Sequence, residues 1–216
     1  MIHVDVISDT VCPWCYIGKR RFEQAVALRP HYDIQVGWRP FQLNPDIPSE
    51  GLPRKEFLSA KFGGVDRADR VYEAATTAGV EVGLNFNFRT IPRQPNTFDS
   101  HRLVRWSEIV GVQDAVVEQL FLTYLMDDTD VGDREALVDI AARCGMDGDL
   151  VRNWFTQDAD RDLVMAEERV ARREGINGVP CFVVDQKYAI SGAQDPSLLT
   201  HVFDLAMQDK RKPINI

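Results

Sequence analysis

Long hydrophobic runs are missing from this chain. Nowhere do 18 or more apolar residues follow one another, so no membrane-spanning helix and no membrane partner are predicted. Residues Met1–Val6 lack the cationic start and apolar stretch of a secretory signal peptide. Internal repeats and low-complexity segments are also absent. We therefore expect a cytoplasmic globular protein.

Positive charge is scarce. The chain has 25 basic residues against 33 acidic ones, a formal net charge of −8, which argues against a protein that neutralises phosphates. Nucleic acid is therefore not an expected partner. Hydrophobic residues make up 44% and charged residues 27%, as in ordinary globular proteins. The 216 residues allow one large domain or a core that carries a smaller insertion.

Cysteines are also few, and their spacing is informative. Reducing conditions in the cytoplasm leave only transient or catalytic disulfides, so the four cysteines do not predict a structural disulfide framework. Cys12 and Cys15 form a Cys-x-x-Cys pair, which serves either as a redox dithiol or as half of a zinc site. A structural zinc site needs two more ligands, and Cys144 and Cys181 are isolated. We therefore favour the dithiol and expect no metal.

The order of predicted elements begins with a β-α-β unit. Apolar alternation predicts a strand over 3–8, helical spacing predicts a helix over 13–29, and a second strand follows over 34–41. A turn-rich stretch over 44–53 then leads out of this unit. Seven predicted helices follow, at 54–62, 66–78, 97–110, 113–126, 133–144, 148–156 and 159–174.

The last part of the chain predicts a hairpin and a helix. Two strands over 181–185 and 188–191 are joined by a tight turn, and a final helix covers 196–207. The order is thus β-α-β, a helical block, and then α-β-β-α. Four glycines that follow periodic runs are expected at left-handed positions just past helix ends: Gly79, Gly111, Gly145 and Gly175.

The position of the cysteine pair suits thiol chemistry. A thiol attacks a disulfide only as its thiolate, and Cys12 precedes Pro13, a residue favoured in the first turn of a helix. The positive end of that helix favours negative charge on the Cys12 sulfur. Cys15 follows one turn later and is placed to resolve a mixed disulfide. Trp14, between the two cysteines, is hard to explain by packing and is a candidate substrate contact together with Pro13.

Three segments give the chain a family resemblance. Cys-Pro-Trp-Cys-Tyr-Ile-Gly at 12–18, Trp-Arg-Pro-Phe-Gln-Leu-Asn-Pro at 38–45 and Gly-Val-Pro at 178–180 resemble the DsbA family of the thioredoxin superfamily, and more closely its cytosolic FrnE-like branch. The resemblance implies an α/β thioredoxin fold with a large all-helical insertion. Residues 1–48 and 159–212 would form the discontinuous thioredoxin-like domain, with the inserted helical domain at 49–158.

The resemblance also implies a role for Val179 and Pro180. Their peptide bond is expected to be cis and to lie against the cysteine pair, with the Val179 N–H and C=O pairing with an extended substrate. From the residues alone, an ordinary trans turn that opens a strand is favoured. Pro-Trp between the cysteines replaces the Pro-His typical of periplasmic oxidants, so strongly oxidising behaviour is not assumed.

Several further residues have two interpretations each. Asp9 either exchanges a proton with Cys15 or, like Thr10, caps the helix. His101 either lines a cleft between the helical block and the core or is structural. Cys181 is either a third thiol near the site or, as free cysteines usually are, a small buried apolar residue, and packing is favoured for Cys144. Three aromatic residues are candidates for an apolar substrate surface: Phe41, Phe86 and Phe88.

Three functions remain open. The leading hypothesis is an enzyme that reduces, forms or isomerises protein disulfides through a Cys12–Cys15 cycle. Its expected partners are protein or peptide thiols and disulfides, with glutathione or a thioredoxin-type reductant as co-substrate and no tightly bound cofactor. The second is a glutathione-dependent isomerase of the 2-hydroxychromene-2-carboxylate type, whose family typically has serine at the first position and lacks the second cysteine. The third is a redox-sensitive chaperone or binding module.

Overall fold

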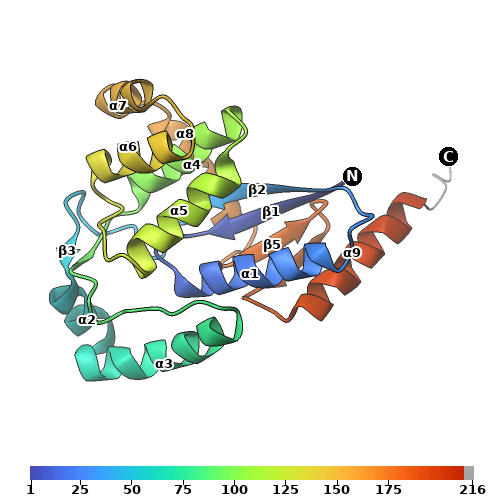
Figure 1. Ribbon diagram of the computed structural model, residues 1–216, viewed down its shortest axis with the longest axis horizontal. Coiled ribbons are helices and arrows are strands. Elements are labelled where there is room, and N and C mark those ends of the chain that lie inside the picture. The colour runs from blue at the N-terminus through green and yellow to red at the C-terminus, as the bar shows by residue number, and fades with distance from the viewer. Residues whose placement is uncertain (212–216) are drawn as a thin grey trace.

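A four-stranded sheet lies at the centre of the computed structural model, which describes residues 1–211; the expected domain boundary at 212 lies outside them. The strand order is β2-β1-β5-β6 (Figure 1). β1 and β2 run parallel, while β5 is antiparallel to both β1 and β6. Together with the helices this confirms the predicted β-α-β and α-β-β-α order. The strands are β1 (Ile2–Ser8), β2 (Ile34–Pro40), β5 (Cys181–Val184) and β6 (Tyr188–Ser191).

The alternation of side chains along β1 decides which helices cover which face of the sheet. Val4 and Val6 enter the main core, which they share with α1 (Pro13–Ala27) and α9 (Pro196–Arg211). Ile7 points to the other face and packs with Cys181 and with α8 (Arg161–Arg173). Figure 1 shows α1 and α9 in front of the sheet, which is therefore covered on both sides.

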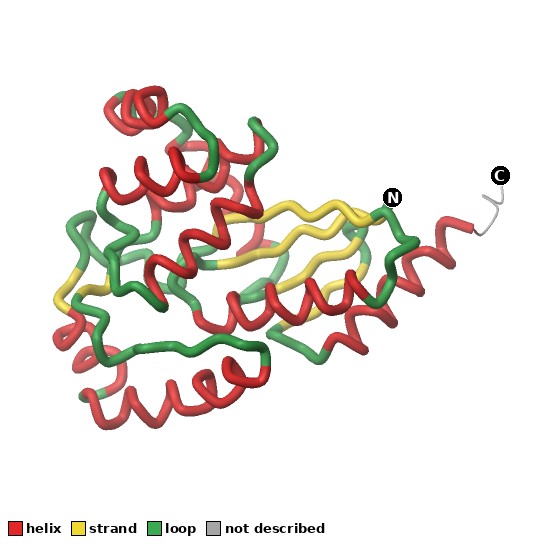
Figure 2. The backbone as a smooth tube through the Cα atoms, in the orientation of Figure 1, coloured by secondary structure: helices red, strands yellow, loops and turns green. Residues whose placement is uncertain are grey.

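The helical block follows β2, and every helix predicted for it is confirmed, with ends within a few residues. Figure 2 shows its helices arranged around one end of the sheet. The final helix α9 extends beyond the predicted end at 207. Besides α8, the helices of the block are α2 (Arg54–Phe62), α3 (Val65–Glu81), α4 (Phe98–Ile109), α5 (Gln113–Leu125), α6 (Arg134–Arg143) and α7 (Gly148–Thr156).

One of the four glycine predictions is wrong. Positive φ angles are found at Gly111, Gly145 and Gly175, but α3 continues past Gly79, and Gly83 takes the positive φ of 79° instead. A Cβ on Gly79 would lie 2.7 Å from the ring of Phe86, so this glycine allows close packing rather than a turn.

A second, two-stranded sheet was not predicted. It pairs β3 (Leu52–Pro53) antiparallel with β4 (Arg93–Gln94). Strands of two residues are too short to carry a periodic signal, so only the tertiary contact defines them. The pair ties the start of α2 to the long connection between α3 and α4 (Figure 2).

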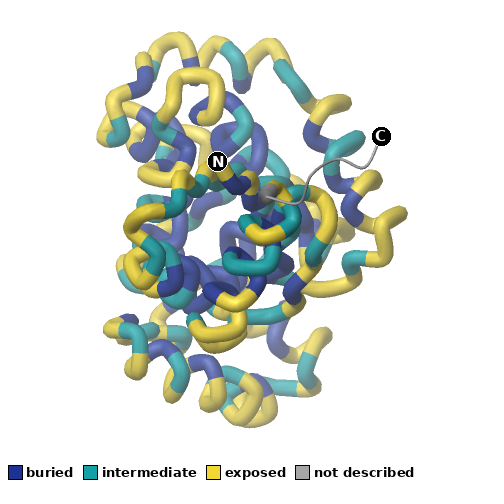
Figure 3. Tube along the Cα trace, turned by 90° about the vertical axis from the view of Figure 1, so that its right-hand side faces the viewer, coloured by how far each residue is buried: buried dark blue, intermediate teal, exposed yellow. Residues whose placement is uncertain are grey.

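The main core runs from the sheet into the helical block without interruption. It includes residues of β1, α1, α4, α5 and α6 in one buried cluster, and Figure 3 shows the buried segments gathered in the interior. The expected division into a domain of 1–48 and 159–212 and an insertion of 49–158 therefore stays a prediction. None of the described helices has the length and hydropathy needed to cross a lipid bilayer.

Candidate functional site

Cys12 occupies the N-cap of α1, with Pro13 in the first turn. No side chain caps this helix end, and the Cys12 carbonyl accepts the N–H groups of Cys15 and Tyr16 at 3.0 and 3.3 Å. The Cys12 side chain thus lies where the free N–H groups and the helix dipole favour a negative charge. Only 5% of Cys12 is exposed, whereas Trp14 beside it is 36% exposed.

Cys15 lies one turn into α1 and is fully buried. Burial raises the pKa of its thiol well above the usual value, and a hydrogen bond with Cys12 raises it further. The Ser8 hydroxyl and the Asp9 backbone act in the opposite direction by hydrogen-bonding to the sulfur. Both cysteines are free thiols, so the pair is described in its reduced form. The more accessible thiol is therefore Cys12 and the protected one is Cys15.

The Val179–Pro180 loop lies against the cysteine pair, and its peptide bond is cis. The Cys12 Sγ is 4.0 Å from the Val179 carbonyl oxygen. A Cβ on Gly18 of α1 would lie 2.9 Å from the Pro180 ring, so glycine at this position lets the loop approach the helix. The fold thus brings together, around the Cys12 sulfur, two segments that lie 167 residues apart in the chain.

Neither Asp9 nor Thr10 caps α1, so the capping interpretation is wrong. The Thr10 hydroxyl hydrogen-bonds to that of Ser100 on α4 at 2.7 Å. Asp9 Oδ2 accepts the Leu43 N–H at 2.7 Å. The segment before the dithiol is therefore held by contacts to α4 and to the loop after β2.

Asp9 and His101 form a buried pair next to the dithiol. Asp9 is 1% exposed and His101 is 3% exposed. Asp9 Oδ1 and His101 Nε2 are 3.5 Å apart, and within the described residues neither atom has a hydrogen-bond partner. Buried polar atoms without a hydrogen-bond partner are rare and costly, and a catalytic role is one reason for them. His101 thus faces the carboxylate that precedes the dithiol rather than lining an open cleft.

An ionic cluster around the buried Lys19 attaches α1 to α5. The Lys19 ammonium is 3% exposed and lies 3.1 Å from both Asp114 and Glu118. Tyr16 donates to Glu118 at 2.7 Å and stacks on Phe121 with ring centroids 5.0 Å apart. These contacts fix the dithiol helix on the helical block.

The remaining predicted residues are buried or packed against the core. Cys181 is buried with Ile7, and burial raises the pKa of its thiol. Cys144 is partly buried against the core at the end of α6. Phe41 is only 1% exposed, so its proposed place in an open substrate surface is wrong. Phe86 packs against Tyr16, with centroids 6.3 Å apart.

Sequence reasoning missed Ser8 and a pocket around Arg54. Ser8 ends a predicted strand, and nothing in its neighbours indicates that its hydroxyl reaches the Cys15 sulfur. Phe88, expected in an apolar substrate surface, lines that pocket together with Tyr72. Within residues 1–211, no group of three or more histidine, cysteine, aspartate or glutamate side chains is arranged to hold a metal ion.

Comparison with known proteins gives a family-level match over nearly the whole chain. A model of the DSBA-like thioredoxin domain matches residues 3–204. YwbO, an uncharacterized protein of Bacillus subtilis, is 26% identical over 217 residues, covering 98% of each chain. The crystal structure of a probable DsbA oxidoreductase from Streptomyces coelicolor is 33% identical with a TM-score of 0.89, covering 100% of this chain and 94% of that one.

Two more distant structures share the fold. Cytosolic disulfide reductase DsbM from Pseudomonas aeruginosa, solved with GSH, is 13% identical with a TM-score of 0.65, covering 95% of this chain and 99% of that one. A 2-hydroxychromene-2-carboxylate isomerase is 13% identical with a TM-score of 0.70, covering 96% and 97%. At this identity the likeness concerns the fold alone. The assignment to a FrnE-like branch stays a prediction.

Proposed function

Because the chain belongs to the DSBA-like thioredoxin-domain family, we propose that it is a thiol–disulfide oxidoreductase whose dithiol is Cys12 and Cys15. The observation that carries the proposal is the placement of Cys12 at the N-cap of α1, 4.0 Å from the Val179 carbonyl, with Cys15 buried behind it. This arrangement gives attack and resolution to different thiols.

The reaction proceeds in two exchange steps. The Cys12 thiolate attacks one sulfur of a substrate disulfide, forms a mixed disulfide and releases the other substrate sulfur as a thiolate. The Cys15 thiolate then attacks the Cys12 sulfur, which closes the Cys12–Cys15 disulfide and releases the second substrate thiolate. Two electrons pass from the protein to the substrate, and the reverse sequence oxidises a dithiol. Val179 pairs with the extended substrate backbone, while Pro13, Trp14 and Pro180 contact it.

Asp9 is the proposed base that removes the proton from the Cys15 thiol. Because burial raises the pKa of the Cys15 thiol, the resolving step needs a base. Asp9→Asn keeps an oxygen for the Leu43 N–H and removes the base. Single-turnover measurements should show the resolving step slowed by about 10²-fold near neutral pH.

The pH profile separates this role from a structural one. Without Asp9, resolution depends on direct loss of the Cys15 proton to solvent, so the rate should rise steeply with pH and approach that of the wild type in alkali. Formation of the mixed disulfide at Cys12 serves as the internal control and should change little. Equal resolving rates in Asp9→Asn and wild type at neutral pH would exclude Asp9 as the base.

Glutathione or a thioredoxin-type reductant is proposed to regenerate the dithiol, and the cytoplasm is the proposed location. Support comes from the structural similarity to DsbM of Pseudomonas aeruginosa, which is named a cytosolic disulfide reductase and was solved with GSH. The 2-hydroxychromene-2-carboxylate isomerase has the same fold. Its family typically lacks the second cysteine, whereas both cysteines are present here, which favours dithiol chemistry over that isomerisation.

The function is tested by equilibrating the protein in glutathione buffers of graded redox ratio. The fraction of the Cys12–Cys15 disulfide is followed by alkylation and mass spectrometry. We expect one reversible two-electron transition with a midpoint above the cytosolic poise of about −220 to −320 mV, so that the dithiol is held reduced in the cell. A midpoint below that range would indicate a disulfide that needs a strong dedicated reductase. Absence of any transition would overturn the proposal.

A further inference from the structure

Arg54 differs from the other buried cations of the molecule. Within residues 1–210, the buried lysine and arginine side chains are Lys19, Arg54 and Arg102. Lys19 and Arg102 have carboxylate partners, the latter Asp99 at 2.7 Å. Arg54 is 7% exposed, and none of its contacts in the described part of the chain is an ion pair. A buried charge without a countercharge is costly, so Arg54 lacks a partner that its surroundings call for.

The hydrogen bonds of Arg54 leave one edge of its guanidinium free. Nη1 donates to Gln94 and to Tyr124 at 3.1 Å, and Nη2 donates to Tyr72 at 2.9 Å. All three acceptors are neutral. Nε is buried and has no partner among the described residues, and Nη2 carries a second N–H. Nε and Nη2 together present the side-on pair of donors that binds a carboxylate in a bidentate manner.

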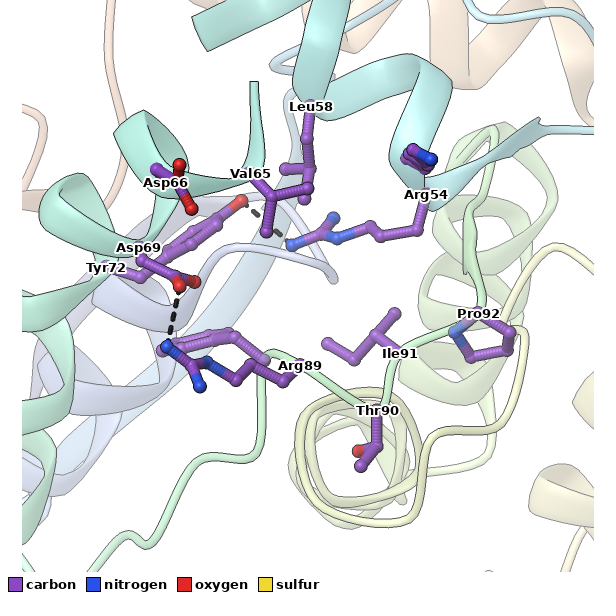
Figure 4. A pocket seen from close by; sticks show the side chains of 12 residues that line it. Arg54, Leu58, Val65, Asp66, Asp69, Tyr72, Arg89, Thr90, Ile91 and Pro92 are labelled. Atoms are coloured by element: carbon purple, nitrogen blue, oxygen red, sulfur yellow. Dashed lines mark hydrogen bonds and ion pairs between the residues drawn. The ribbon is translucent and has the colours of Figure 1, made fainter.

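Arg54 is one of the residues that line a pocket of about 570 Å³. Figure 4 shows the Arg54 side chain extending into the pocket towards Tyr72. Two carboxylates line the same pocket, and among the described residues neither forms an ion pair with Arg54: Asp69 pairs with Arg89 at 2.8 Å, and Asp66 is the other. Much of the remaining wall is apolar, and the planar fork of a guanidinium matches the two oxygens of a carboxylate. The apolar lining residues are Leu58, Val65, Phe88, Ile91 and Pro92.

Hydrogen bonds link the helix that carries Arg54 to the segment before the dithiol. Lys61, on the same helix as Arg54, donates to Asn44 at 2.5 Å, and the adjacent Leu43 binds Asp9. Burial raises the pKa of the Tyr72 hydroxyl, Arg54 lowers it in part, and the charge of Cys12 raises it. Tyr72, which holds Arg54, is therefore within electrostatic reach of the attacking sulfur.

We propose that the Arg54 pocket binds a carboxylate of the dithiol's substrate, so that preferred substrates are cysteine peptides with an acidic side chain near the reacting disulfide. This inference rests on the proposed function of Cys12 and Cys15. It adds a specificity subsite that is formed by α2, α3 and residues 88–92 and does not include the Val179 loop. The apolar walls would contact the side chains that flank the acidic residue.

The test uses peptide disulfides in which one glutamate is scanned outwards from the cysteine on either side, with an all-glutamine parent. Reduced protein is mixed with each peptide, and the second-order rate constant of exchange is measured. We expect one or two spacings to react about tenfold faster than the parent, since a charge-assisted bidentate contact has that strength. In Arg54→Gln, the ratio of glutamate to parent rates should fall to about one. If no spacing raises the rate in wild type, the inference is overturned.

Lys55→Gln is the matched control. Lys55 also lines the pocket and carries the same charge, but it is exposed, so solvent screens it. The glutamate preference should persist in Lys55→Gln and be lost only in Arg54→Gln. Equal loss in both variants would indicate general electrostatic attraction and contradict a site at Arg54.

Two further measurements keep the test decisive. If Arg54→Gln does not fold, wild-type protein is assayed with the glutamate methyl ester peptide, which should react at the rate of the parent. Thermal stabilisation by free succinate that depends on Arg54, without any glutamate preference, would assign the pocket to a free acid and overturn the substrate role. The parent peptide reports the proposed function by itself, because it reacts through Cys12 whether or not Arg54 contributes.

Discussion

Cys12→Ser is expected to lower the rate of disulfide exchange by at least about 10³-fold, since it removes the thiol that we propose as the attacking group. A serine hydroxyl at the N-cap is not a nucleophile towards disulfides, and Cys15 is completely buried. The rate should be measured with the all-glutamine parent peptide under single-turnover conditions. The fold should be retained, because serine is a preferred N-cap residue.

Cys15→Ser is the informative companion to this variant. Cys12 still attacks, but no second thiol resolves the product, so a mixed disulfide should accumulate at one equivalent per chain and be visible by mass spectrometry. Cys144→Ser, away from the site, should behave as wild type. Retention of full turnover in Cys12→Ser would exclude the dithiol mechanism.

Lys19→Met is expected to lower the free energy of unfolding by about 3 kcal/mol, the lower end of what breaking a buried ion pair costs. The lower end applies because the carboxylates left behind are partly exposed, Glu118 by 21% and Asp114 by 54%. Methionine keeps the length of the side chain, so the change isolates the lost charge. Urea unfolding monitored by circular dichroism measures the difference.

The pH dependence of this difference follows from the pKa shifts. Burial opposes the charge of Lys19, but hydrogen bonding to Glu23 and the neighbouring carboxylates raise its pKa above 10.5. A group whose pKa is higher in the folded than in the unfolded protein stabilises the fold at pH values below its unfolded-state pKa. The difference in unfolding free energy between wild type and Lys19→Met should therefore persist from neutral pH to about pH 10 and shrink above it. Lys187→Met, which breaks an exposed pair with Asp209, should cost less than about 1 kcal/mol. Equal losses in both variants would contradict a buried role for Lys19.

Local patterns in the sequence were sufficient for most of the fold. The periodicity of apolar residues located the strands of the main sheet and the helices, because an element that buries one face has apolar residues at regular intervals in its own sequence. The two-residue strands at 52–53 and 93–94 are too short to show such a pattern. Gly79 shows the same limit, because a glycine that admits the ring of Phe86 looks like one that ends a helix.

For the candidate site, the sequence by itself was sufficient to predict the dithiol, since the Cys-x-x-Cys pair, the proline after its first cysteine and a helical pattern are adjacent in the chain. Through the family resemblance, the sequence also suggested that Pro180 lies against the cysteine pair. Only the tertiary structure paired Asp9 with His101 and placed Arg54 in a pocket without a carboxylate partner. Those relations join residues from different elements, and burial of a charge depends on what packs around it. No local pattern records such contacts, so they become visible only when the chain is folded.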